Sequence, residues 1–200
     1  MFNHIPGLLF NPRQEWKKIA HLSDEALKRQ LPYFIVMALI PAVGFYYGTT
    51  QVGWSIIGDK VYRITESSAL PLTVLFYAAI VGSVLAVGYI IHWMSRTYRG
   101  DSFRIKDFVL VGYAMTPVFI AGAFSFYPIF WLDIIIATAA CSYMIYQLYV
   151  AIPLLLHVPE ERGFLFASAV MMMVLVLAVV ILGATVILWE LGAMPVFIDG

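Results

Sequence analysis

The chain has 200 residues, of which 62% are hydrophobic and 12% are charged, and its mean hydropathy is +0.87. Soluble domains are about 45–50% apolar and about 25% charged, so this composition excludes a soluble enzyme and indicates an integral membrane protein. Twelve Lys and Arg residues balance twelve Asp and Glu residues, which leaves no net charge for a nucleic-acid partner, and the single cysteine excludes an intrachain disulfide framework.

Residues 1–30 are expected to form a cytoplasmic amphipathic segment with a short interfacial helix. Asn11 followed by Pro12 is a helix start signal, and Trp16 and Ile19 give that helix an apolar side, while Lys17 and its basic neighbours lie elsewhere. Tryptophan anchors such helices among lipid headgroups, and lysine is attracted to anionic lipid. Two interpretations stay open: an anchor that sets the tilt of the first span, or a docking surface for a cytoplasmic partner.

Five long uncharged stretches follow, and they predict an all-α integral membrane bundle of five transmembrane helices. Each stretch is at least as long as the ~20 residues that a helix needs to cross ~30 Å of hydrocarbon. None shows the ~10-residue alternation of a membrane β-barrel. Local start and stop signals place the spans at about 31–47, 71–94, 108–126, from 131 onward, and 164–189.

The third span contains the most distinctive backbone signal of the chain. Pro117 cannot donate a helical hydrogen bond and crowds the carbonyl of Tyr113, while Thr116 can bond to a freed carbonyl and Gly112 lies one residue before Tyr113. We therefore expect a kink near the middle of the membrane. It has three interpretations: a hinge, a binding recess or a static packing kink. Pro153 is expected to bend or end the fourth span in the same way.

Ionisable residues near the membrane are costly and are therefore candidates for a specific role. Asp133 is the one acidic residue expected near the interior of a span, in the first turn of the fourth helix, where the helix N-terminus favours a carboxylate. A second hypothesis gives it a hydrogen bond from Lys60 or Arg63 at the outer rim. His92 falls near the inner end of the second span, where we expect interfacial hydrogen bonding.

The distribution of Lys and Arg predicts the orientation. With the N-terminus inside, ten of the twelve basic residues are cytoplasmic and two, Lys60 and Arg63, are external. Cytoplasmic loops of membrane proteins carry such an excess, and no cleavable signal peptide is recognisable at the start of the chain. The expected organisation is a cytoplasmic segment 1–30, a five-span domain 31–190 and an external, periplasmic tail 191–200.

Several motifs carry a resemblance to a known family. They are Asn11-Pro12 with Trp16, and the stretches 48–54 (GTTQVGW), 112–117 (GYAMTP), 127–131 (YPIFW) and 148–153 (LYVAIP). Over almost its whole length the chain resembles the bacterial YohC-like branch of the Yip (Ypt-interacting protein) family. This resemblance implies five spans and a cytoplasmic N-terminus. Eukaryotic members act in vesicle traffic with Rab-type GTPases and with each other, but their Asp-Leu-Tyr-Gly-Pro motif is absent here, so Rab binding is not expected.

No catalytic, metal-binding or cofactor motif accompanies these features, so we expect neither enzyme activity nor a cofactor. The favoured function is a non-enzymatic membrane-organising or adaptor factor of the bacterial inner membrane, whose partners are the lipid bilayer and either a second copy or another membrane protein. The alternative is a small transporter, channel or lipid-translocating protein built around the kinked third span. The candidate residues are Trp16, His92, Gly112, Tyr113, Thr116, Pro117, Asp133 and Pro153.

Reporter fusions test the predicted orientation. A reporter that is active only outside the cytoplasm should give a signal when fused after Gly200 and none when fused after Arg104, because the basic residues hold the loop near Arg104 inside. A reporter active only in the cytoplasm serves as the matched control and should give the reverse pattern. Activity of the external reporter after Arg104 would contradict the orientation.

Overall fold

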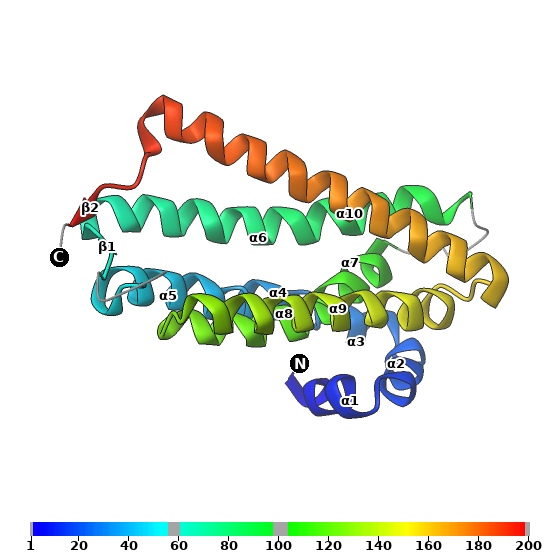
Figure 1. The fold of residues 1–200 in the computed structure, drawn as a ribbon. Coiled ribbons are helices and arrows are strands. Elements are labelled where there is room, and N and C mark those ends of the chain that lie inside the picture. The colour runs from blue at the N-terminus through cyan, green and yellow to red at the C-terminus, as the bar shows by residue number, and fades with distance from the viewer. Residues whose placement is uncertain (1, 56–60, 98–103, 199–200) are drawn as a thin grey trace.

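The computed structural model describes residues 2–55, 61–97 and 104–198, and this part of the chain is almost entirely helical. Five helical segments within it are long and apolar enough to cross a membrane, which confirms the predicted all-α membrane bundle. They run alongside one another in alternating directions, with short N-terminal helices packed on one side (Figure 1). The segments are Asp24–Val52, Glu66–Ser95, Ile105–Phe126, Phe130–Leu155 and Glu161–Ala193.

The spans differ in how continuous their helices are. The second, fourth and fifth are long helices: α6 (Glu66–Ser95), α9 (Phe130–Leu155), and α10 (Glu160–Leu188) followed by the π-helical turn η4 (Trp189–Ala193). The first consists of α3 (Asp24–Lys28), α4 (Pro32–Met37), α5 (Leu39–Tyr47) and the π-helical turn η2 (Gly48–Val52). The third consists of α7 (Arg104–Ala114), α8 (Thr116–Ala121) and the 3₁₀ turn η3 (Gly122–Phe126).

A short β-ribbon closes one end of the bundle. Strand β1 (Arg63–Ile64), just before α6, pairs antiparallel with β2 (Phe197–Ile198) near the C-terminus. The last described residues therefore return from α10 to the start of α6 (Figure 1). We call this the ribbon end of the bundle, and the opposite end, where α2 (Pro12–Ala20) lies, the α2 end.

Three helices, α6, α7 and α10, begin earlier than predicted; α10 starts at Glu160 rather than at about residue 164. Helix α6 starts at Glu66 rather than at Pro71, because the carbonyl of Thr65 accepts hydrogen bonds from the next turn and so starts the helix before the proline. Pro71 is accommodated inside the helix. Helix α7 starts at Arg104, so the third span includes Asp107, which lies just before the predicted start at about residue 108.

The third span is interrupted where the sequence predicts a kink. Helix α7 ends one residue before Met115 and α8 begins one residue after it, with Pro117 in the first turn of α8. The Thr116 hydroxyl donates to the Tyr113 carbonyl at 2.6 Å, as expected. Because that donation uses its single proton, Thr116 accepts from the Tyr33 hydroxyl, whose oxygen lies 2.9 Å away on α4.

The interruption is packed tightly against the first span. Tyr33, Tyr113 and Thr116 are at most 1% exposed, and the Tyr113 hydroxyl donates to Gln30 at 2.8 Å. A Cβ added to Gly112 would lie only 3.2 Å from the Cβ of Phe34, so this glycine lets α7 and α4 approach closely. A hydrogen-bonded, fully buried break favours the static packing kink over the hinge and the recess.

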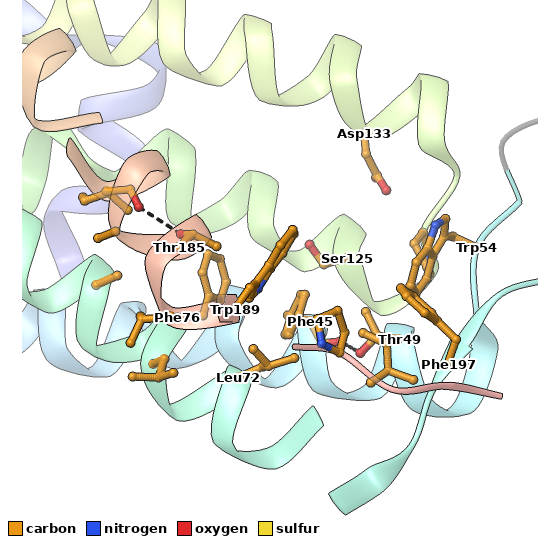
Figure 2. A pocket seen from close by; sticks show the side chains of 18 residues that line it. Phe45, Thr49, Trp54, Leu72, Phe76, Ser125, Asp133, Thr185, Trp189 and Phe197 are labelled. Atoms are coloured by element: carbon orange, nitrogen blue, oxygen red, sulfur yellow. Dashed lines mark hydrogen bonds between the residues drawn. The ribbon is translucent and has the colours of Figure 1, made fainter. Parts of the chain in front are cut away.

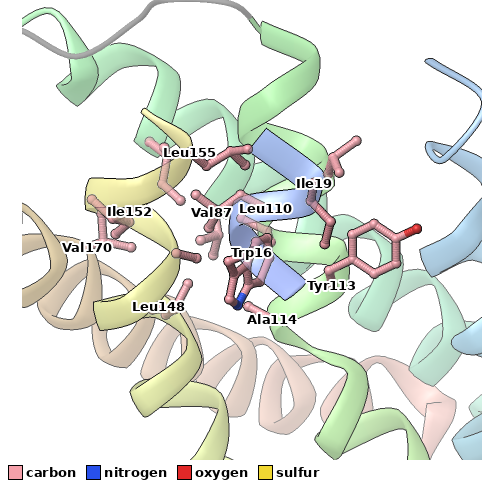
Figure 3. Close-up of a cluster of buried hydrophobic side chains, with 14 of the residues drawn as sticks. Trp16, Ile19, Val87, Leu110, Tyr113, Ala114, Leu148, Ile152, Leu155 and Val170 are labelled. Atoms are coloured by element: carbon pink, nitrogen blue, oxygen red, sulfur yellow. The ribbon is translucent and has the colours of Figure 1, made fainter. Parts of the chain in front are cut away.

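The N-terminal arm, formed by η1 (Phe2–His4), α1 (Ile5–Phe10) and α2, docks onto the bundle. Trp16 is fully buried between α7 and α9 (Figure 3), and its indole N–H donates to the Gln147 side-chain oxygen at 2.5 Å. The Gln147 amide donates to the Leu8 carbonyl at 2.6 Å, and the Tyr143 hydroxyl to the Leu9 carbonyl at 2.7 Å. These bonds supply donors to carbonyls at the end of α1 that have no donor within the helix.

The prediction that Trp16 lies among lipid headgroups is therefore wrong. The tryptophan lies inside the protein rather than among lipid headgroups, because α9 offers the buried acceptor that its N–H group requires. Helix α2 does begin at Pro12, as predicted, and Lys17 on its outer side is exposed.

Glu15 of α2 links this helix to η1 through a hydrogen bond with His4. Its carboxylate is 6% exposed and lies 2.8 Å from the Lys18 ammonium and 2.6 Å from the His4 ring nitrogen Nδ1. Burial acts to raise the pKa of Glu15, but the hydrogen bonds and charges of Lys18 and His4 outweigh it, so this pKa lies below its ordinary value.

Thr116→Val tests the buried bonds at the interruption. The nearly isosteric change leaves the Tyr33 hydroxyl buried without its acceptor, so it should lower the free energy of unfolding by about 1–3 kcal/mol. Thermal unfolding in detergent measures this, with Thr138→Val on the exposed side of α9 as the matched control. Tyr33→Phe should add little to Thr116→Val, since both remove one interaction. Fully additive losses would contradict the bond.

Glu15→Gln tests the arm. Because the pKa of Glu15 is depressed in the fold, its stabilising contribution is complete above the unfolded-state pKa of about 4.3. It is lost as the pH falls through the lower folded pKa. The variant should therefore melt below the wild type at neutral pH, and the two melting temperatures should converge in strong acid. Exposed Glu25→Gln is the control; a difference that persists in acid would contradict this pairing.

Candidate functional site: an apolar cavity with one carboxylate

A cavity of about 670 Å³ lies toward the ribbon end, and all five spans contribute to its lining, the third through Ser125 of η3. Figure 2 shows side chains from these elements converging on it. Its walls are mainly aromatic and aliphatic, with three hydroxyls and one carboxylate. The aromatic residues are Phe45, Trp54, Phe76, Trp189 and Phe197; the polar ones are Thr49, Ser125, Asp133 and Thr185; the others are Ile64, Leu72, Leu75, Ala79, Pro128, Ile181, Ala184, Leu188 and Pro195.

The course of α10 leaves room for this cavity. At the α2 end α10 packs closely, with Phe166 and Val170 fully buried, and a Cβ on Gly163 would lie 3.0 Å from Pro153 of α9. Toward the ribbon end the helix inclines away from α6 (Figure 1). Only 17% of its most apolar stretch is buried, against 50% for the third span. The chain then returns through β2, so that Phe197 covers the cavity beside Trp54.

Two of the four polar side chains in the wall, Thr49 and Thr185, already donate hydrogen bonds within the protein. The Thr49 hydroxyl donates to the Phe45 carbonyl at 2.7 Å, and the Thr185 hydroxyl to the Ile181 carbonyl at 2.9 Å. Threonines bonded in this way to their own helix present mainly a methyl group to a cavity. Both hydroxyl protons are therefore directed away from any cavity ligand.

Asp133 is the charged side chain in the described cavity wall. It lies in the first turn of α9, as predicted, and its side chain points into the cavity (Figure 2). One carboxylate oxygen, Oδ1, is buried with no hydrogen-bond partner among the described residues. Arg63, one of its two hypothesised partners, instead donates to the Val52 carbonyl at 3.3 Å, and Lys60 lies outside the described residues.

His92 forms a separate polar pair at the other end of the bundle. Its ring nitrogen Nδ1 lies 3.0 Å from Oδ2 of Asp107 on α7, and both residues are buried. The sequence predicts a hydrogen bond for His92 but not this carboxylate as its partner. Asp107 stands beside Lys106 at the edge of the uncharged stretch, a position that is typical of a loop.

The structure thus distributes the candidate residues over separate places. Gly112, Tyr113, Thr116 and Pro117 come together at the interruption of the third span, and Trp16 lies beside them against α9. The others are His92 at the α2 end, Pro153 at the junction of α9 with α10, and Asp133 in the cavity. Among the described residues no group of three or more His, Cys, Asp or Glu side chains is placed to hold a metal ion.

The fold defines a multi-pass, all-helical membrane protein, and comparison with known proteins gives its family. The Yip1 domain matches residues 7–182, so the chain belongs to the Yip1 domain family. It is 32% identical over 190 residues to the inner membrane protein YohC of Escherichia coli strain K12, covering 95% of this chain and 97% of that protein. The YohC protein of Escherichia coli O6:H1 strain CFT073 gives the same values. No solved structure matches.

Proposed function

We propose that this multi-pass inner-membrane protein is not an enzyme and acts by binding an amphipathic molecule from the bilayer in the cavity beside α10. The observation that carries the proposal is the cavity itself, whose volume of about 670 Å³ lies within the range of small-molecule sites. Apolar walls with one oriented polar group are typical of such sites. The two threonine hydroxyls bonded to their own helices support binding rather than catalysis.

This role is closest to the alternative function drawn from the sequence, a small transporter, channel or lipid-translocating protein. It differs in placing the site away from the kink of the third span. The interruption of the third span is packed against the first span, whereas the cavity is lined mainly by residues of α6, α9, α10 and the end of the first span. In the orientation that the basic residues predict, the cavity faces the periplasmic half of the membrane. An amphipathic molecule would then enter from the outer leaflet.

The membrane-organising or adaptor role is the second candidate, and the exposed face of α10 favours it. Val179, Leu182 and Val186 are each more than half exposed along the part of the helix next to the cavity. Such a face meets either lipid or another transmembrane helix. A second copy of this chain or another membrane protein is the partner that this role requires.

Photolabelling tests the binding function. The protein is placed in phosphatidylcholine nanodiscs with three diazirine probes that share a dodecyl chain and carry an ammonium, a hydroxyl or a carboxylate. At least one probe should label cavity residues of α6, α9 or α10. Ala184→Phe, which fills the cavity, should reduce that labelling several-fold, whereas Val186→Phe, on the exposed side of the same helix, should not. Labelling confined to lipid-facing residues with all three probes would refute the binding function.

A further inference from the structure

The chemistry that selects a ligand in this cavity must differ from the chemistry of the bilayer. Lipid tails are as apolar as leucine or valine side chains, so an alkyl chain gains little by moving from lipid into apolar walls. Selectivity must therefore come from polar groups in the wall. Thr49 and Thr185 donate to backbone carbonyls of their own helices. Of the other polar groups in the described lining, the Ser125 hydroxyl and the indole N–H groups of Trp54 and Trp189 are neutral, so the carboxylate of Asp133 is the charged group that distinguishes the cavity from lipid.

Among the described residues, the cavity lining supplies no positively charged side chain to Asp133. None of the described residues that line the cavity is Lys, Arg or His, and Oδ1 of Asp133 is buried without a hydrogen-bond partner. A buried charge without a partner is costly, and a carboxylate recovers most when a cation or strong donor comes within hydrogen-bond distance. The cavity is thus complementary to a positive group.

We propose that the ligand is a lipophilic ammonium, a single alkyl chain whose cationic head lies against Asp133. This inference rests on the proposed binding function. The chain would extend along the apolar side chains of Leu72, Phe76 and Ile181. Trp54 and Trp189 add indole faces, which attract cations as well as apolar chains.

The same lining disfavours the commoner membrane amphipaths. A fatty acid would bring its carboxylate toward that of Asp133, and a phospholipid would bring a phosphate, while no basic side chain among the described lining residues stands ready to balance either. A fatty alcohol can donate a hydrogen bond to the carboxylate but leaves its charge unbalanced. The ammonium is the head group that neutralises Asp133 without adding a negative charge.

The three dodecyl probes test this selectivity. In neutral phosphatidylcholine nanodiscs, labelling of the cavity is divided by labelling of lipid-facing residues on α10, which corrects for partition into the bilayer. The ammonium probe should reach half-maximal cavity labelling at a concentration about tenfold or more below that of the alcohol, and the carboxylate probe should label least.

Two substitutions assign the preference to the carboxylate. Asp133→Asn should reduce cavity labelling by the ammonium probe to the level reached by the alcohol probe. Asp133→Glu, which keeps the charge, should retain the preference for the ammonium probe. Asp24→Asn, an exposed change on α3, is the matched control, and size-exclusion profiles and melting temperatures show that each variant is folded. If Asp133→Asn fails to fold, the three probes on the wild type and Asp133→Glu decide.

The possible outcomes separate this inference from the function on which it rests. Equal labelling by the ammonium and alcohol probes, a preference for the carboxylate, or an ammonium preference unchanged in folded Asp133→Asn would overturn the inference and leave the binding function intact. Absence of cavity labelling with all three probes would overturn the binding function as well.

Discussion

The structure depends on one constraint: in a membrane, every buried polar group must find its partner inside the protein. The indole of Trp16 meets Gln147, and the hydroxyl of Tyr33 meets Thr116. Each such pair joins two segments that are distant in the sequence, so satisfying the polar groups also fixes the packing of the helices. Among the described residues two carboxylate oxygens depart from this rule, Oδ1 of Asp107 and Oδ1 of Asp133, and it is Asp133 that lies in the wall of the cavity.

The packing is uneven along the length of the bundle. Near the α2 end, the arm, α7 and α9 enclose a continuous core that includes Leu110 and Ile152 (Figure 3). Toward the ribbon end, α10 leaves its neighbours, and aromatic side chains and the returning strand β2 line the space that results. The closely packed α2 end thus supports a less closely packed ribbon end. This arrangement would suit the proposed entry of a ligand from the side.

What the sequence predicted well is what local chemistry decides. The five spans follow from the absence of charge over long stretches, and the interruption of the third span follows from Pro117 and the hydroxyl beside it. The burial of Trp16 could not be predicted, because its acceptor lies 131 residues away. Asp107 was missed because a charge at the edge of a span resembles a loop residue until its partner His92 is placed. The cavity depends on the inclination of α10, which no local pattern encodes.

The docked N-terminal arm has a consequence for biosynthesis. The side chain that accepts the hydrogen bond of Trp16 belongs to the fourth span, so the ribosome completes the arm long before its docking surface exists. During that interval Trp16 and Ile19 have no protein to cover them, and the nearest apolar medium is the surface of the membrane. The arm can therefore take up its buried position only after the fourth span has been synthesised.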